Sequence, residues 1–143
     1  MTASEIIEAL GLRRHPEGGY FKETWRDVPE GGGRGLGTAI YYLLRHGEVS
    51  KWHRVDATEI WHFYAGSPLE IRIRDGGVAT EGMLGSDLAR GERPQLVVPA
   101  GAWQSARSRA GPPEGYTLVG CTVSPAFRFE GFELAPESFE EGG

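Results

Sequence analysis

His53 and Glu59 stand six residues apart in the segment 47–66, which is otherwise rich in aromatic and β-branched residues. The short polar stretch at residues 56–58 separates two runs with high β propensity. Because glycines bound the segment on both sides, it predicts a β-hairpin. A hairpin would place the imidazole of His53 beside the carboxylate of Glu59. Such a pair suits a general base whose ring is oriented by a carboxylate. It also suits a purely structural hydrogen bond between two buried polar groups.

Strand alternation over residues 59–64 decides which side chains share a face with the carboxylate. One face carries Glu59, Trp61 and Phe63, and the other carries Ile60, His62 and Tyr64. A carboxylate that shares its face with Trp and Phe indicates a lined cavity rather than a surface in contact with water. We assign the opposite face to a second sheet or to a homodimer interface.

Further aromatic and polar residues are candidates for the lining of this cavity. The aromatic candidates are Trp61, Phe63, Tyr41 and Trp103, and the candidate polar anchors are Gln104, Arg26 and Lys51. An apolar lining with a few polar groups is typical of small-molecule sites. The same aromatic residues also fit ordinary packing in the core of a β protein.

Two motifs carry a resemblance to a known family. The spacing of Gly47, His53, Val55, Glu59 and Gly66 is similar to the first cupin motif, which normally has a second histidine at the position of Val55. The stretch 99–104 resembles the second cupin motif, with Gln104 in place of its metal-binding histidine. From residues 14–20 to residues 129–134, the chain also resembles a subfamily of small single-domain cupins without a settled activity.

The resemblance implies a cavity that, in metal-binding cupins, supplies three imidazoles and one carboxylate to a divalent metal. Here Val55 cannot coordinate a metal, and His53, Glu59 and Gln104 remain as three possible ligands. We therefore expect no cofactor, with a weakly bound divalent metal as the alternative.

The similarity to cupin sugar epimerases implies a metal-independent isomerase or epimerase that acts on a sugar or another carbonyl compound. His53 would be its base, with Glu59 as the partner of that base, and Tyr41 or Tyr64 would be its acid. Two alternatives stay open: a binding module for small polar ligands without catalysis, and an enzyme with a weakly bound divalent metal.

The loop at residues 15–19 contains two further polar residues, His15 and Glu17. Pro16 and a glycine pair interrupt regular structure there, so we expect a surface loop in which the histidine acts as a cap. The resemblance places this loop, together with Glu23 and Arg26, near the mouth of the cavity.

The whole chain predicts an all-β fold of one domain. Apolar runs alternate with glycine and proline turns, so we expect about ten short strands over residues 13–134 in an antiparallel sandwich or barrel. The resemblance implies that this is a cupin-type antiparallel double-stranded β-helix (a jelly-roll barrel). A helix within residues 1–12 is predicted by a capping box at Thr2 and Glu5 and by the stop at Gly11. Residues 135–143 form an acidic tail that we expect to be frayed.

Composition narrows the classes of partner. The 143 residues carry a net charge of −5 and a sequence pI of about 5.4, which argues against binding to nucleic acid. No apolar run has the length of a membrane span, so we expect no membrane partner. The lone Cys121 fits a buried strand position and a reducing cytoplasm. We expect a small-molecule ligand and, from the family, a homodimer.

Overall fold

The chain begins with one helix, α1 (Ala3–Leu10), whose ends have the predicted chemistry. The Thr2 hydroxyl accepts a hydrogen bond from the backbone N–H of Glu5, and the Glu5 carboxylate accepts one from the N–H of Thr2. Gly11 ends the helix at a φ of 68°, where glycine is favoured because it has no Cβ. Ile6 packs against Leu43, so α1 covers part of the outer face of one sheet.

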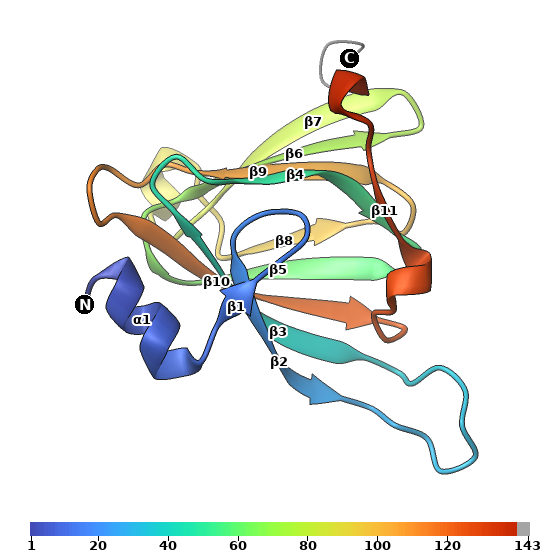
Figure 1. The fold of residues 1–143 in the computed structure, drawn as a ribbon. Helices are drawn as coiled ribbons and strands as arrows, with labels where there is room; N and C mark the ends of the chain where they lie inside the picture. The colour runs from blue at the N-terminus through green and yellow to red at the C-terminus, as the bar shows by residue number, and fades with distance from the viewer. Residues whose placement is uncertain (140–143) are drawn as a thin grey trace.

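A computed structural model describes residues 1–139, and their eleven strands form two antiparallel sheets that face each other (Figure 1). The first sheet has the order β1 (Arg13–Arg14), β2 (Tyr20–Arg26), β3 (Thr38–Arg45), β10 (Tyr116–Ser124), β5 (Thr58–Gly66) and β8 (Gln95–Val98). The second has the order β11 (Phe132–Leu134), β4 (Val49–Val55), β9 (Trp103–Ser108), β6 (Leu69–Asp75) and β7 (Val78–Leu84). Short 3-10 helices span Leu88–Arg90, Phe129–Gly131 and Glu137–Phe139. The predicted all-β architecture of the cupin type is confirmed.

The core lies between the inner faces of the two sheets. Its largest members are Tyr42, Leu44, Trp61, Ile71 and Leu84, all at most 1% exposed. On β5 the inner face carries Glu59, Trp61 and Phe63, as strand alternation predicts, and Tyr64 points outward at 53% exposure. None of the helices described here is both long and apolar enough to cross a membrane.

The predicted hairpin at residues 47–66 is wrong. β4 pairs with β9 and β11 in one sheet, and β5 pairs with β10 and β8 in the other. The residues between them, Asp56 and Ala57, therefore carry the chain from one sheet to the facing sheet. Local sequence does not separate the two outcomes, because a short polar link suits both. As a result His53 and Glu59 are not neighbours across a hairpin and project from opposite walls of the barrel.

A β-bulge interrupts the pairing of β4 with β9. Ser50 lies opposite Ala106 and His53 lies opposite Gln104, so two residues of β4, Lys51 and Trp52, face one residue of β9. The bulge turns both side chains to the outer face of the sheet, where the Trp52 ring lies 4.5 Å from the guanidinium of Arg74. Simple alternation places Lys51 on the same face as His53, and the bulge is the reason why this fails.

The loop at residues 15–19 folds inward instead of lying on the surface, which corrects the prediction for His15 and Glu17. Glu17 is only 5% exposed, and its carbonyl accepts a hydrogen bond of 2.8 Å from the N–H of Lys51. The capping role of His15 is confirmed, since its Nδ1 accepts the N–H of Glu17 at 3.1 Å. Two glycines with positive φ, Gly18 and Gly19, make this inward turn possible.

The C-terminal part is irregular, and its tail differs from the prediction. Residues 127–134 do not form one continuous strand, because the 3-10 helix Phe129–Gly131 precedes the short β11. The tail is not wholly frayed, since the Phe139 ring packs 4.9 Å from Trp103 and 5.3 Å from Trp52. Residues 140–143 lie outside the described part of the chain.

The close packing of Gly18 predicts a large effect of a single methyl group. A Cβ at Gly18 would lie 2.2 Å from the carbonyl oxygen of Val49, and its φ of 110° disfavours any other residue. We expect Gly18→Ala to lower the free energy of unfolding by roughly 2–4 kcal/mol. Gly32→Ala is the control, because Gly32 also has a positive φ but a Cβ added there would meet no atom within 4 Å. Gly32→Ala should lower the free energy of unfolding by only about 1 kcal/mol. Urea unfolding measures both variants, and an equal loss of stability in the two would contradict the role of the close contact between Gly18 and Val49.

Candidate functional site

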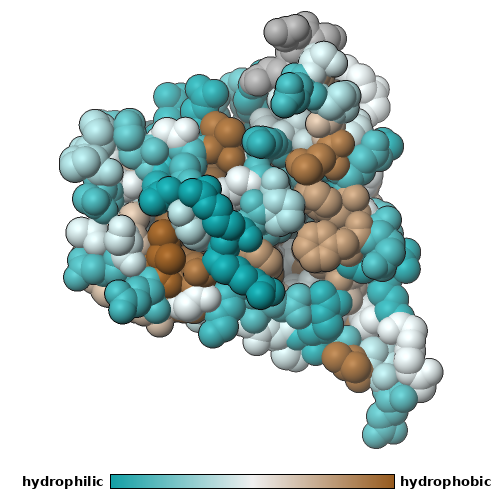
Figure 2. Space-filling model, viewed as in Figure 1, coloured by the Kyte–Doolittle hydropathy of each residue, from teal (hydrophilic) through white to brown (hydrophobic). Residues whose placement is uncertain are grey.

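A small cavity of about 60 Å³ opens between the two sheets at the end where β11 and the 3-10 helix Phe129–Gly131 lie. The polar groups of its lining are His15, Glu17, Glu23, Arg26, Thr38, His53, Glu59 and Cys121. Phe127, Phe129 and Phe132 line it toward the outside, with ring centroids 5.0–6.1 Å apart. Figure 2 shows apolar surface around this part of the molecule. The volume suits a few water molecules or one small polar group.

His53 is held at both ring nitrogens. Its Nδ1 lies 2.7 Å from the carbonyl oxygen of Lys51, and because a carbonyl can only accept, Nδ1 carries a proton. Its Nε2 lies 2.9 Å from Oε2 of Glu17, and both side chains are buried. A single proton can therefore bridge Nε2 and the carboxylate, which makes this a closed, hydrogen-bonded pair.

Charge is favoured on both members of the pair. Burial alone would lower the pKa of His53, but the attraction of Glu17 and the hydrogen bond to it raise the pKa to about 9. Burial alone would raise the pKa of Glu17, yet the His53 imidazolium lowers it below its ordinary value. At neutral pH the pair is an imidazolium and a carboxylate. His53 then has no lone pair with which to accept a proton.

His15 contributes a neutral ring beside this ion pair. Its Nδ1 accepts a backbone hydrogen bond, so that nitrogen is not protonated. Burial lowers the pKa of His15, although Glu17 partly opposes this effect. The ring packs edge-on against Phe21 at 4.6 Å, which fixes the orientation of the loop that carries Glu17.

Glu59 enters the cavity from β5 and belongs to a second hydrogen-bonded chain. The indole N–H of Trp61 donates to Oε1 of Gln104 at 2.9 Å, and Nε2 of Gln104 donates to Oε1 of Glu59 at 2.8 Å. The indole can only donate, so it fixes which end of the Gln104 amide faces Glu59. The amide therefore presents its NH₂ group, not its oxygen, to the carboxylate.

Glu59 is the group in the cavity whose titration falls near neutral pH. Burial raises its pKa to about 7, and the positive charge of His53 limits the rise. Cys121, the neighbouring cavity residue on β10, stays a thiol because burial and then the charge of Glu59 raise its pKa. The prediction that Cys121 is a buried strand residue is confirmed.

The three possible metal ligands named from the sequence, His53, Glu59 and Gln104, do not fit a metal ion in this arrangement. Nε2 of His53 is occupied by Glu17, and the oxygen of Gln104 is turned toward Trp61. Val55 lines the cavity with an apolar side chain. Within residues 1–139, no group of three His, Cys, Asp or Glu side chains is placed to hold an ion.

The other predicted site residues lie in three places. Arg26 lies at the cavity, while Trp61 and Phe63 belong to the core and do not appear in its lining. Tyr41, Lys51 and Trp103 point to outer faces and take no part in the cavity: Tyr41 packs near α1, and Trp103 lies under the guanidinium of Arg54. Tyr64 is also outside, 6.4 Å from Tyr41. The described residues place no tyrosine in the cavity lining.

Sequence reasoning missed the central role of Glu17 and the contribution of Tyr42. The Tyr42 hydroxyl donates to the carbonyl of Gly18 and also interacts with Glu17, so it supports the inward loop from β3. The alternation of β3 places Tyr42, rather than Tyr41, on the same face as Ile40, which lines the cavity. This was the available signal for Tyr42. No local pattern predicted that the loop would fold inward.

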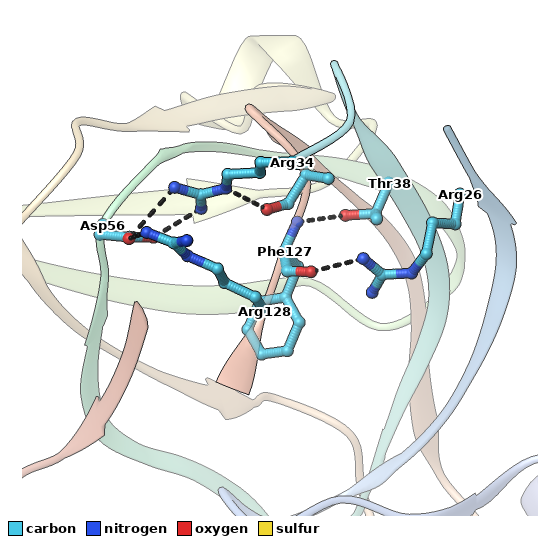
Figure 3. A network of polar contacts seen from close by, with 7 residues as sticks. Arg26, Arg34, Thr38, Asp56, Phe127 and Arg128 are labelled. Carbon is cyan, nitrogen blue, oxygen red and sulfur yellow. Dashed lines mark hydrogen bonds and ion pairs between the residues drawn. The ribbon is translucent and has the colours of Figure 1, made fainter. Parts of the chain in front are cut away.

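A network of arginines fixes the mouth of the cavity (Figure 3). Arg34 and Arg128 both reach the carboxylate of Asp56, at 2.6 Å and 3.2 Å. Arg34 also donates to the carbonyl of Ala126, and Arg26 donates to that of Phe127. These contacts tie the segment 126–128 to β2 and to the link between the sheets, so the aromatic wall of the mouth is held in place.

Comparison with known proteins agrees with this architecture. The model of the Cupin superfamily (DUF985) family matches residues 4–135, and the chain belongs to that family. An uncharacterized protein of Saccharomyces cerevisiae, YML079W, is 31% identical over 148 residues, which cover 90% of this chain and 73% of the yeast protein.

Solved structures show the same relationship. Protein SO0799 of Shewanella oneidensis superposes with a TM-score of 0.90 at 40% identity, over 99% of this chain and 89% of that one. A hypothetical protein from Leishmania major superposes with a TM-score of 0.86 at 33% identity, over 96% of this chain and 89% of that one. Two more distant structures share the fold alone. A dTDP sugar isomerase of Desulfovibrio desulfuricans has a TM-score of 0.61 at 17% identity, over 88% of this chain and 87% of that one. An oxalate decarboxylase of Bacillus subtilis has a TM-score of 0.61 at 15% identity, over 85% of this chain and 29% of that one.

The contact between Glu17 and His53 predicts a large change in the titration of the histidine. In Glu17→Gln the carboxylate that favours the imidazolium is gone, and the amide NH₂ can donate to a neutral Nε2. We expect the pKa of His53 to fall from about 9 to below 6.5, because burial then dominates. NMR titration of the histidine rings measures this change. His62, on the outer face beside Thr122, is the internal control and should titrate as before.

The raised pKa of Glu59 predicts how stability depends on pH. The folded protein binds the proton more tightly than the unfolded chain, so wild-type stability falls as the pH rises from about 4.5 to about 7. Glu59→Gln keeps the acceptor for Gln104 and removes the ionisation. The quantity to compare is the unfolding free energy of the variant minus that of wild type. We expect this difference to be a few kcal/mol larger at pH 8 than at pH 4.5. A difference in unfolding free energy that stays constant across this range would contradict the assignment.

Proposed function

We propose that the chain binds a small polar molecule in the barrel cavity and transfers a proton on it without a metal, as an isomerase or epimerase of a carbonyl compound. The observation that carries this proposal is the buried carboxyl of Glu59, which lines the cavity and has a pKa of about 7. A general acid–base group works best when its pKa lies near the working pH. Glu59 thus takes the role that the sequence suggested for His53.

The step follows from the charges in the cavity. The ionised Glu59 carboxylate accepts a proton from the carbon next to the carbonyl, and the electron pair of that C–H bond moves onto the carbonyl oxygen as an enolate. Return of the proton to the opposite face of the same carbon gives the epimer and regenerates the carboxylate. In an α-hydroxy carbonyl compound, the proton of the hydroxyl on that carbon can instead move to the enolate oxygen. Glu59 then returns its proton to the former carbonyl carbon, so the carbonyl has changed place and the carboxylate is regenerated. The His53 imidazolium supplies positive charge that favours the enolate. Glu17 and Lys51 position His53 through the contacts described above.

The size of the cavity limits what enters it. At about 60 Å³ it accommodates the reacting carbons and not a whole sugar nucleotide. The remainder of a substrate would lie at the mouth, against Phe129, which is 55% exposed, and near Arg26. Small hydroxycarbonyl compounds and short sugars are therefore the first candidates.

A second candidate function is a binding module without turnover. The observation in its favour is that the polar groups of the cavity already satisfy one another, through Glu17 with His53 and Gln104 with Glu59. In addition, no tyrosine acid lines the cavity within the described residues. A metal-dependent enzyme is a weaker alternative, because the amide oxygen of Gln104 faces Trp61.

The test is exchange of substrate C–H protons with D₂O, followed by NMR over a panel of small sugars and hydroxycarbonyl compounds. We expect exchange to rise with pH through a midpoint near 7 and to fall at least 100-fold in Glu59→Gln. Glu81→Gln, on the exposed strand β7, is the matched control and should keep full activity. Exchange that persists after treatment with EDTA supports the metal-independent reaction. If a compound stabilises the protein against heat but shows no proton exchange, the result would contradict the enzyme proposal and favour a binding module.

A further inference from the structure

A second and larger hollow lies on the outer face of the other sheet. It has a volume of about 410 Å³, within the range of small-ligand sites. It is lined by Val49, Lys51, Trp52, Ser105, Arg107 and Pro136, and we call it the outer groove. Its floor is the bulged part of β4 with β9, and residues 135–137 form one wall. No residue of the barrel cavity lines it, so it is a separate site.

The outer groove has a local excess of positive charge on an acidic protein. Lys51, Arg72 and Arg107 line it, against the two carboxylates of Glu70 and Glu137. Glu70 already faces Arg109 at 3.4 Å. Within residues 1–139, the side chains of Lys51 and Arg107 form no ion pair or hydrogen bond. Lys51 and Arg107 lie on adjacent strands, and two unpaired positive side chains so placed favour the binding of a compact dianion.

The rest of the lining suits an apolar or flat group. The ring of Trp52 stands at one side of the groove, fixed by Arg74 at 4.5 Å and Phe139 at 5.3 Å. Pro136 and Ala135 add apolar surface on the wall opposite the sheet. The small side chain of Ser105 keeps the floor open and presents a hydroxyl.

We propose that the outer groove binds a small phosphate monoester with an apolar or flat substituent. Lys51 and Arg107 bind the phosphate, and the substituent packs between Trp52 and Pro136. This site is independent of the reaction proposed for the cavity.

Lys51 also links the outer groove to the cavity. Its side chain faces the groove, while its N–H donates to Glu17 and its carbonyl accepts from Nδ1 of His53. The bulge makes this double orientation possible, because it frees backbone groups from the pairing with β9. A ligand that binds the side chain of Lys51 would therefore shift the backbone of the same residue, which is hydrogen-bonded to Glu17 and His53. We expect this shift to change the environment of the His53 ring.

Phenyl phosphate is the probe, titrated into the full chain by calorimetry at low ionic strength. We expect binding that weakens at least tenfold in Lys51→Met and in Arg107→Gln. The chain has only two lysines, so Lys22→Met on the exposed part of β2 is the matched control and should bind as wild type. Benzoate, which carries one charge, should bind at least tenfold more weakly than phenyl phosphate. Since the changed side chains are exposed, melting curves should confirm that every variant remains folded.

NMR separates the outer groove from the barrel cavity. On saturation we expect shifts at the amides of residues 49–52 and 105–107 and at the ring N–H signals of His53, with unchanged affinity in Glu59→Gln. No binding, equal affinity in Lys51→Met and Lys22→Met, or loss of binding in Glu59→Gln would overturn the proposal. Binding without any change at His53 would refute the link through Lys51. These results do not depend on whether the cavity turns over a substrate.

Discussion

The buried ion pair of His53 and Glu17 is the constraint around which the cavity is built. Two opposite charges can stay inside a protein only when each is paired and its remaining hydrogen-bonding groups have partners. Four separate parts of the chain meet this demand. The loop at residues 15–19 supplies the carboxylate, and the bulge in β4 supplies the backbone carbonyl that accepts from His53. The Tyr42 hydroxyl donates to the loop at Gly18, and the Phe132 ring lies 5.4 Å from the imidazole ring. The pair as a whole is neutral, so it leaves Glu59 as the one carboxyl in the described cavity lining without a cation bonded to it.

Gln104 gives this cavity a chemistry different from that of a metal centre. An imidazole in its position could turn a lone pair toward an ion, whereas the amide must satisfy the indole of Trp61 with its oxygen. Its NH₂ group then donates to Oε1 of Glu59 and fixes the orientation of that carboxyl group. With glutamine at the position where the motif has a histidine, this side chain orients a carboxyl group and turns no lone pair into the cavity.

Much of the fold could be predicted from the sequence, and the candidate site only in part. Helix α1 and the alternation of β5 are local patterns, and a single sequence shows such patterns directly. Three features that shape the site depend on distant parts of the chain. The link at Asp56 joins opposite sheets, the bulge reverses Lys51, and the glycine pair turns Glu17 inward against Val49. Each is decided by packing across the barrel, so the sequence points to His53 and Glu59 but not to the partner of His53.

The link between β4 and β5 also sets the height of the barrel at the end where the cavity opens. Only Asp56 and Ala57 lie between the last residue of one sheet and the first of the other. Three successive peptide units span at most about 11 Å, and facing sheets pack about 10 Å apart. A connection of this length leaves little slack between the two sheets. The covalent chain therefore limits how far the two walls can separate at this end, and with it the width of the cavity between them.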